Sequence, residues 1–303
     1  MSIRYRVRHS DFIKPFWDEG EKPKGVLCFQ FYELNWSNGC VGACDYCYLR
    51  GTFRWSGWMG GEQTIFSNTS KMFREVELFL KVKDKPTVLH TGEVNDSLAA
   101  APDCNPIMSR LVQMFGAQNK HTLLLLTKSD NVDFLLNLPH NGRTVVGFSL
   151  NPKPVVEEYE HNTAPVERRI EAMRKCGEAG YPVMARIDPM IPVDGWRELY
   201  TDLFEQVNQI PNLRGAVVGS IRAFIGLWNQ LRPDLKEMLT ERDVDGRRHL
   251  PRALRDEMYD LGFTKLKTRR IGVCKESGML WSSLIKKHGA RQFICNCHCQ
   301  EVM

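Results

Sequence analysis

The sequence predicts an α/β fold in which a parallel sheet covered by helices curls into a partial (β/α)6 barrel. Short apolar segments alternate with segments of helical spacing along most of the chain, a pattern typical of parallel sheets. Residues 122–127, Thr-Leu-Leu-Leu-Leu-Thr, read as a strand buried on both faces. Six strand–helix units curl into a partial barrel more naturally than they extend as a flat sheet.

Each predicted strand is a short apolar segment bounded by turn-forming residues. The strands are residues 26–31, 87–90, 122–127, 144–150, 183–187 and 215–221. Helices are predicted where apolar residues recur at intervals of three and four, at residues 70–81, 107–117, 132–138, 165–179 and 196–209. Residues 236–262 are expected to be helical in part, and residues 281–287 to form a last short helix.

Three regions are expected along the chain. Residues 1–24 are polar and interrupted by prolines, which predicts an extended N-terminal arm that lies over the domain. Residues 25–225 contain the six predicted strands and form the core domain. Residues 226–303 form a C-terminal extension that contains further cysteines.

The composition is that of an ordinary soluble globular protein, with 43% hydrophobic and 25% charged residues. No run approaches the ~20 apolar residues that a membrane span needs, and nothing near the N-terminus reads as a signal peptide. Seven of the ten cysteines fall in patterns that suit metal rather than disulfides, so we expect a cytoplasmic protein. The net charge of +5 favours an anionic partner only weakly, although nine basic residues crowd into residues 242–270.

A loop of three cysteines directly after the first predicted strand is the strongest chemical signal in the chain. Cys40, Cys44 and Cys47 have C-x3-C-x2-C spacing, and an aromatic residue, Tyr48, follows the last of them. Thiolates are the ligands of iron–sulfur clusters, and three of them leave one iron of a [4Fe–4S] cluster without a protein ligand. The alternative is zinc, but zinc sites usually add a second pair of ligands, which is not found nearby.

Further short motifs follow the cysteines along the chain. They are Thr127-Lys128, Asn141-Gly142, Phe148-Ser-Leu-Asn151, Ala179-Gly-Tyr181, Pro189 and Gly195-Trp196. Together with the cysteine loop they resemble the spore photoproduct lyase branch of the radical S-adenosylmethionine superfamily, over roughly residues 26–225. The resemblance implies a barrel of the radical S-adenosylmethionine type. It also implies that the open iron chelates S-adenosylmethionine, which an electron then cleaves to a 5′-deoxyadenosyl radical.

The resemblance also implies roles for residues at the ends of the predicted strands. Cys40, Cys44 and Cys47 hold the cluster, and Glu93, after Gly92, takes the amino group of the methionine as a charge-assisted pair. Lys128 is expected to meet the cofactor carboxylate, although a surface lysine that caps a strand–helix junction is the alternative. The remaining candidates for cofactor binding are Tyr48, Asp96, Ser97, Ser149 and Asn151.

The chain departs from the family at the hydrogen-donating cysteine. The repair lyase carries this cysteine near the turn after the second strand, where this chain has Thr91, Gly92 and Glu93. Cys104 or Cys176 could replace it, but each could equally be a small buried apolar residue. Isomerisation or another modification of the substrate is therefore an alternative to repair.

A second departure is the cysteine-rich C-terminal part. Cys274 is followed by three cysteines at alternate positions, Cys295, Cys297 and Cys299, with His298 between the last two. These thiols suit a second iron–sulfur cluster, with zinc as the alternative and a tail without metal as the third possibility. Cys299 is the thiol that such a site could most easily spare.

These observations predict a radical S-adenosylmethionine enzyme that modifies, isomerises or repairs a thymine-derived base in DNA. The base would be flipped out of the duplex, and Arg269 and Arg270 would contact phosphates. An external electron donor of the flavodoxin or ferredoxin type is expected. Two alternatives stay open: a substrate that is RNA, a peptide or a small metabolite, and an iron–sulfur DNA-binding protein whose clusters are only structural.

Overall fold

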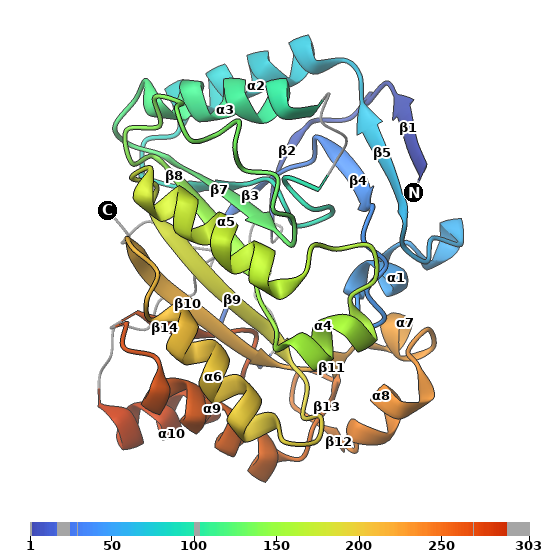
Figure 1. Cartoon of the computed structure of the whole chain (residues 1–303). Helices are drawn as coiled ribbons and strands as arrows, with labels where there is room; N and C mark the ends of the chain where they lie inside the picture. The colour runs from blue at the N-terminus through green and yellow to red at the C-terminus, as the bar shows by residue number, and fades with distance from the viewer. Residues whose placement is uncertain (1, 17–24, 29, 100–103, 269, 290–303) are drawn as a thin grey trace.

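The computed structural model describes residues 2–16, 25–28, 30–99, 104–268 and 270–289. An eight-stranded sheet lies at its centre, in the order β14-β10-β9-β8-β7-β6-β3-β2 (Figure 1). Its strands are β2 (Ile13–Pro15), β3 (Tyr32–Leu34), β6 (Val88–His90), β7 (Thr122–Thr127), β8 (Thr144–Ser149), β9 (Val183–Met190), β10 (Leu213–Ser220) and β14 (Ile271–Val273).

The expected partial (β/α)6 barrel is confirmed. Strands β3, β6, β7, β8, β9 and β10 are neighbours in chain order and run parallel to one another. Strand β14 continues this parallel arrangement beside β10, whereas β2 is antiparallel to β3. In the part of the chain that the structure describes, β2 and β14 are the two edges of this sheet, so the barrel is open.

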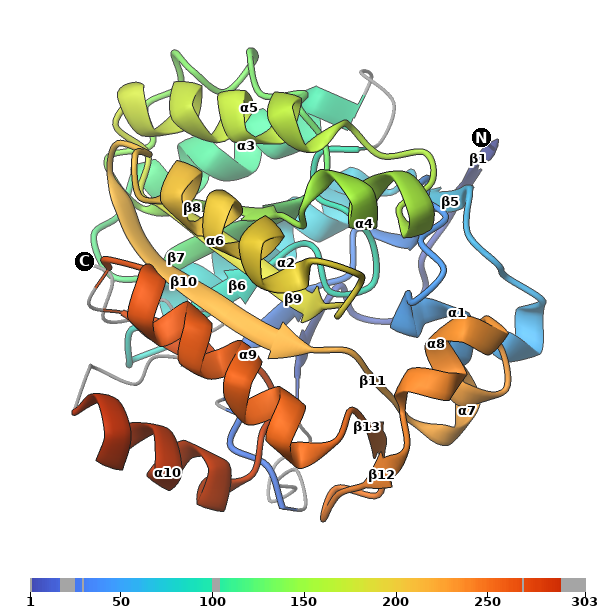
Figure 2. The ribbon, with the colours of Figure 1, turned by 60° about the horizontal axis from the view of Figure 1, so that its bottom comes forward.

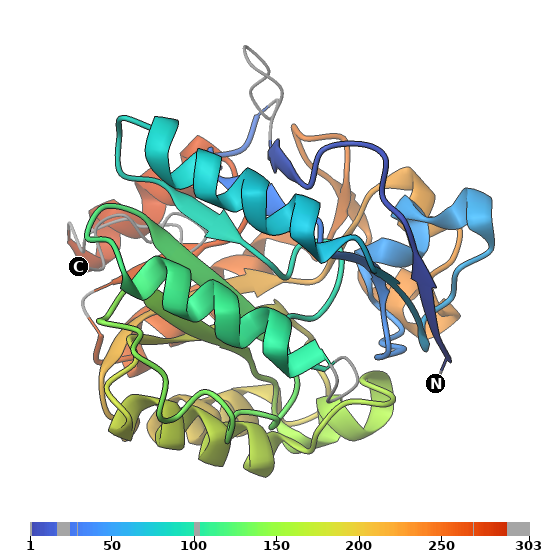
Figure 3. The same ribbon diagram turned by 90° about the horizontal axis from the view of Figure 1, so that it is seen from above.

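Helices cover the outer face of the sheet, as right-handed connections between sequential parallel strands require. Figures 1 and 3 show α2 and α3 side by side above the sheet, and Figure 2 shows α9 alongside β10, with α10 beyond it. The longer helices are α2 (Thr69–Val82), α3 (Asn105–Gly116), α5 (Val166–Glu178), α6 (Trp196–Val207), α9 (Arg252–Lys265) and α10 (Gly278–His288). None of the described helices is long and apolar enough to cross a membrane.

The strands separate two apolar cores by the alternation of their side chains. Leu123 and Leu125 of β7 belong to the large core under the helices, whereas Leu124 packs inside the barrel with Val145 and Met184. Residues two or four positions beyond these inner ones therefore reach the inside of the barrel near its C-terminal end. This alternation positions the candidate site.

Two predicted elements are wrong. The described residues between 26 and 31 do not form the expected strand: β3 begins at Tyr32, because the neighbouring β6 (Val88–His90) is itself only three residues long and limits the ladder. Val26 instead forms an isolated bridge with Ser277. Residues 132–138 are not a helix either, because the backbone hydrogen bonds of this segment between Asp130 and Pro139 span only two or three residues, as in turns.

A smaller sheet carries the cysteine loop. Here β5 (Glu62–Phe66) pairs parallel with β1 (Ser2–Arg6) and antiparallel with β4 (Ser37–Cys40), in polar segments where no strand was expected. Two stretches of the expected N-terminal arm, β1 and β2, are thus strands, and residues 17–24 lie outside the described residues.

Within the expected C-terminal extension, β14 joins the central sheet and a third, three-stranded sheet forms beside the barrel. The elements of this part before α9 are α7 (Ile225–Trp228), α8 (Pro233–Met238), β12 (Glu241–Arg242) and β13 (Arg248–His249), and β13 also pairs with β11 (Arg222–Ala223). Helix α7 packs against α1 (Tyr48–Thr52), which directly follows the cysteine loop.

The contact between α1 and α7 depends on Gly51. A Cβ atom on Gly51 would lie 2.6 Å from Phe224 Cζ and 2.7 Å from the backbone carbon of Gly226. We therefore expect Gly51→Ala to lower the free energy of unfolding by about 1–3 kcal/mol through overpacking, as measured by urea unfolding followed by circular dichroism. The control is Gly278→Ala, whose Cβ would meet no atom within 4 Å; equal midpoints for both variants would contradict this account.

Candidate active site

The C-terminal ends of the parallel strands surround a cavity of about 600 Å³. This size is typical of small-molecule sites. Ten of the predicted site residues line it: Cys40, Cys44, Cys47, Tyr48, Gly92, Glu93, Asp96, Lys128, Ser149 and Cys274. They come from the cysteine loop and from the ends of β6, β7, β8 and β14. The structure thus brings together residues that are up to 234 positions apart in the chain (274 − 40).

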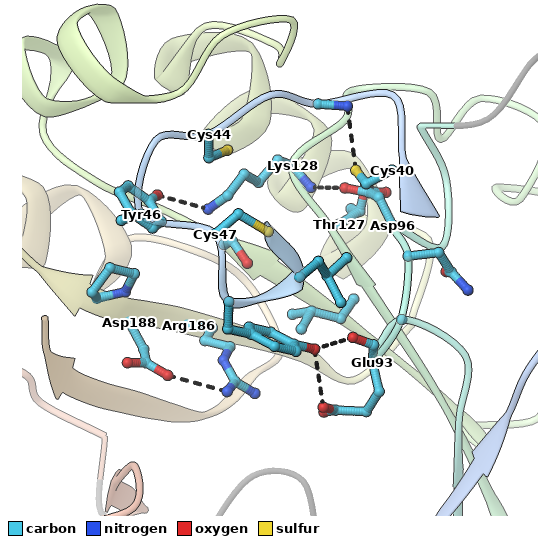
Figure 4. A pocket seen from close by; sticks show the side chains of 18 of the residues that line it. Cys40, Cys44, Tyr46, Cys47, Glu93, Asp96, Thr127, Lys128, Arg186 and Asp188 are labelled. Carbon is cyan, nitrogen blue, oxygen red and sulfur yellow. Dashed lines mark hydrogen bonds and ion pairs between the residues drawn. The ribbon is translucent and has the colours of Figure 1, made fainter. Parts of the chain in front are cut away.

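The three cysteines of the loop converge on this cavity (Figure 4). Backbone hydrogen bonds from Ala43 N to His161 O (2.8 Å) and from Asp45 N to Tyr159 O (2.9 Å) fix the loop, and Gly42 N donates to Cys40 Sγ at 3.3 Å. Burial raises the pKa of all three thiols. Metal binding would deprotonate them, and three thiols around one cavity fit the donor set of a [4Fe–4S] cluster with one open iron.

A buried carboxylate, Glu160, holds Lys128 in place beside the loop. Lys128 Nζ lies 3.2 Å from the Tyr46 hydroxyl (Figure 4). It also lies 3.4 Å from Glu160 Oε1, and the Tyr46 hydroxyl donates to Glu160 as well. Arg169 Nη1 lies 2.6 Å from the other oxygen, Glu160 Oε2. Burial would raise the pKa of Glu160, but Lys128, Arg169 and the hydrogen bonds outweigh it and lower the pKa to about 2.

Glu93 lies at the end of β6 between Tyr48 and His90. The Tyr48 hydroxyl donates to the Glu93 carbonyl and lies 3.3 Å from its Oε2 (Figure 4). His90 Nδ1 accepts from Gly92 N at 3.0 Å, which puts the hydrogen of a neutral ring on Nε2, 3.6 Å from Glu93 Oε1. Burial lowers the pKa of His90 to about 4, so the ring is neutral at pH 7.

Three other predicted residues have mainly structural contacts. Asp96 accepts hydrogen bonds from Thr127 Oγ1 and from Lys128 N, both at 2.6 Å, and so joins the ends of β6 and β7. Ser97 Oγ bonds Leu126 N at 2.9 Å, and Asn151 Nδ2 donates to Glu160 at 2.9 Å. Ser97 and Asn151 are buried and lie behind the cavity wall rather than on it.

The remaining predicted sites are placed only in part. Cys274 lies on the cavity wall, where Arg186 Nη2 and Arg222 Nη2 donate to its Sγ at 3.5 and 3.2 Å. Its predicted partners in a second metal site, Cys295, Cys297 and Cys299, lie outside the described residues, so that site stays a prediction. Cys28 also lines the cavity, whereas Cys104 and Cys176 are buried in the main core.

Only one of the two predicted phosphate contacts lies within the described residues. Arg269 is outside the described residues, and Arg270 precedes β14, at the end of that strand away from the cavity. The basic residues on the cavity wall, besides Lys128, are Arg186, Arg222, Arg247 and Lys275. Arg247 belongs to the basic run at residues 242–270, whereas the sequence did not single out the other three. Arg186 could have been considered together with Asp188, because both share the inner face of β9 with Met184.

A second group of ligand-type side chains is balanced by an arginine. Asp243, His249 and Glu276 bring their ligand atoms within 4.8 Å of one another. Arg255 lies between the carboxylates, with Nη1 2.8 Å from Glu276 Oε2 and Nη2 2.7 Å from Asp243 Oδ2. The guanidinium thus takes the place that a cation would occupy.

The low pKa of Glu160 makes stability depend on pH. Because the carboxylate titrates at a lower pH when folded, its contribution is complete above about pH 4.5 and is lost as the pH falls toward 2. We expect Glu160→Gln to lower the free energy of unfolding at pH 7 by about 3 kcal/mol and to remove this part of the acid dependence. Urea unfolding of the full chain between pH 7 and pH 3 measures both effects.

The matched control for this prediction is Glu157→Gln, which changes an exposed carboxylate of the surface pair with Lys153. It should change the free energy of unfolding by less than about 0.5 kcal/mol at either pH. Identical acid dependence in the wild type and in Glu160→Gln would show that Glu160 is not the titrating group.

Spore photoproduct lyases from two bacteria match this chain in sequence. That of Bacillus subtilis (strain 168) is 30% identical over 179 residues, which are 58% of this chain and 51% of the relative. That of Geobacillus sp. (strain Y412MC61) is 26% identical over 178 residues, which are 58% of this chain and 50% of the relative. The chain thus spans about half the length of the curated relatives it matches.

Solved structures of spore photoproduct lyases share the fold. One, complexed with dinucleoside spore photoproduct, has a TM-score of 0.68 and 21% identity, over 86% of this chain and 77% of that one. A double mutant with bound AdoMet and dinucleoside spore photoproduct has a TM-score of 0.67 at the same identity and coverage. The family model for spore photoproduct lyase matches residues 28–219, more than half of the chain. The resemblance found in the sequence is therefore confirmed, and this chain belongs to the spore photoproduct lyase family.

Proposed function

We propose that this chain is a radical S-adenosylmethionine enzyme, of the lyase or isomerase type, that acts on a thymine-derived base in DNA. The observation that carries the proposal is the convergence of Cys40, Cys44 and Cys47 on one cavity. Glu93 and Lys128 lie on the walls of the same cavity, where they can meet a cofactor. Membership of the spore photoproduct lyase family supports the same chemistry.

A [4Fe–4S] cluster on the three thiolates would supply an open iron for S-adenosylmethionine and the electron that cleaves this cofactor to a 5′-deoxyadenosyl radical. The residues of the chain bind and orient the cofactor. The Glu93 carboxylate pairs with the methionine ammonium, and Lys128, held by Glu160, pairs with the methionine carboxylate. Apolar wall residues such as Phe31 and Leu126 help to exclude water from the cavity. The electron comes from a flavodoxin- or ferredoxin-type donor in the cytoplasm.

The substrate assignment is supported by the relatives. Solved spore photoproduct lyases are complexed with dinucleoside spore photoproduct. In this chain, a base held in duplex DNA would have to leave the stack to reach the cavity. Because Thr91, Gly92 and Glu93 stand near the position where the family resemblance places the donor cysteine, the proposal includes isomerisation or modification as well as repair.

Two thiols on the cavity wall bear on this choice. Cys28 and Cys274 line the cavity, and they are therefore better placed to return a hydrogen atom to a substrate radical than the core residues Cys104 and Cys176. A second iron–sulfur cluster or zinc ion that used Cys274 would exclude this role for it. The second metal site thus stays an independent part of the proposal.

The reaction is tested by anaerobic turnover with S-adenosylmethionine and a strong reductant. We expect one of two DNAs, ultraviolet-irradiated DNA or DNA that carries modified thymines, to stimulate 5′-deoxyadenosine formation above the level without DNA. Mass analysis of the digested nucleosides then separates reversal of a photolesion from formation of a new base. Cys44→Ala should abolish 5′-deoxyadenosine formation while retaining the circular dichroism spectrum of the fold. The two remaining thiolates cannot hold a [4Fe–4S] cluster that has a single open iron.

The two parts of the proposal fail separately. If the wild type forms 5′-deoxyadenosine but neither DNA stimulates it, the DNA assignment is wrong and an RNA, peptide or metabolite substrate takes its place. Full activity in Cys44→Ala would instead make the cluster assignment untenable.

The role of Glu93 is tested by Glu93→Gln. We expect this variant to bind S-adenosylmethionine at least about tenfold more weakly, because the amide cannot form the charge-assisted pair with the ammonium. Equilibrium binding measures the affinity, and iron and sulfide analysis checks that the cluster is retained. In the control, Glu62→Gln, an exposed carboxylate away from the cavity wall is changed; equal affinities in the two variants would rule out the assigned role.

A further inference from the structure

The cavity wall is divided by charge. Near the cysteine loop and the ends of β6 and β7, its charged residues are Glu93, Asp96 and Lys128. Near the ends of β9, β11 and β14 they are Arg186, Asp188, Arg222, Arg247 and Lys275. The first part carries two acidic groups and one basic group, whereas the second carries four basic groups and one acidic group. The second part is therefore the basic side of the cavity.

Arg186 and Arg222 share one carboxylate on this basic side. Arg186 Nη2 lies 3.1 Å from Asp188 Oδ2 (Figure 4). Arg222 meets both oxygens of Asp188, with Nη1 2.9 Å from Oδ1 and Nη2 3.3 Å from Oδ2. Burial would raise the pKa of Asp188, but the two guanidiniums outweigh it and hold the pKa well below its usual range. The three groups are therefore all charged at pH 7, with a net charge of about +1.

The backbone fixes these side chains in position. Arg186 and Asp188 follow Met184 on the inner face of β9, and Arg222 begins β11. Gly219 of the neighbouring β10 leaves space for the carboxylate, because a Cβ atom there would lie 2.8 Å from Asp188 Cγ. Side chains held on strands in this way are preorganised for a ligand.

This arrangement favours an anionic ligand. The Arg186 and Arg222 side chains are only 20% and 14% exposed, and both line the cavity. Guanidinium groups that are largely shielded from water attract an anion more strongly than exposed ones do. The planar guanidinium matches the oxygens of a carboxylate or a phosphate.

We propose that Arg186, Arg222 and Asp188 form an anion subsite that binds an oxyanion carried by the substrate. The oxyanion is either a phosphate beside the target nucleotide or a carboxylate on the substituent of its base. The methionine carboxylate of the cofactor is assigned to Lys128, which lies in the other part of the cavity. This inference rests on the proposed function, since it defines a chemical feature of the substrate of that same site.

Calorimetric titration of the full chain with its cluster, without reductant, tests the subsite. The probes are thymidine, thymidine 5′-monophosphate and 5-carboxymethyl-2′-deoxyuridine. We expect one charged probe to bind about 10- to 100-fold more tightly than thymidine, the range of a hydrogen bond to a charged group. A preference for the monophosphate identifies the DNA backbone as the source of the oxyanion, and a preference for the carboxymethyl compound identifies the base substituent.

Variants then assign the preference to the two arginines. Arg222→Gln and Arg186→Gln should each bring the charged probe to the affinity of thymidine and leave S-adenosylhomocysteine within about twofold of the wild type. In the control, Arg168→Gln, an arginine of an exposed ion pair with Asp130 is changed, and the preference should be retained.

Three results would overturn the subsite. They are equal affinities of all three probes for the wild type, a preference that survives in both arginine variants, and variants that weaken S-adenosylhomocysteine instead. The first comparison needs no variant, so it decides the matter even if the variants do not fold. The binding experiment needs no turnover, so it is independent of the activity test. Activity on DNA without a preference for a charged probe would refute the subsite alone. A preference for a charged probe without activity on DNA would refute the proposed function alone.

Discussion

The site depends on one buried carboxylate. Glu160 is reached by Tyr46 of the cysteine loop, by Lys128 after β7 and by Asn151 after β8, and Arg169 of α5 neutralises it from behind. These partners come from separate parts of the chain, and their shared contact with the Glu160 carboxylate fixes their positions relative to one another. A buried charge tolerates little displacement of its partners, which keeps the loop and the strand ends in register.

The sequence predicts the barrel and half of the cavity, because both follow from local patterns. Apolar runs indicate the strands, and the spacing of the cysteines indicates the cluster loop. Most of the basic side of the cavity could not be found in this way: Arg222 and Cys274 meet only because β14 pairs with β10, a contact that no periodicity reveals. The strand at residues 26–31 was misplaced for a similar reason, since the neighbouring strand limits the ladder.

The two sides of the cavity also differ in their relation to the family. The match to the family ends at residue 219, so it includes the cysteine loop, Glu93 and Lys128. Arg222, Arg247, Cys274 and Lys275 lie beyond it, although they line the same cavity. The wall near the cysteine loop and also Arg186 and Asp188 of the basic side therefore lie within the residues that match the family. The remaining residues of the basic side are where this chain can differ in the substrate it accepts.

The close backbone contact between Gly51 and Gly226 has a consequence for protein engineering. Residues from 226 onward look like an appendage that could be exchanged between relatives to change specificity. Yet α7 is seated directly against α1, and β14 completes an edge of the barrel. In a chimera joined at this boundary, poor packing between α7 and α1 would displace the helix that directly follows Cys47. Grafts should therefore carry α1 and α7 together as one interlocking unit.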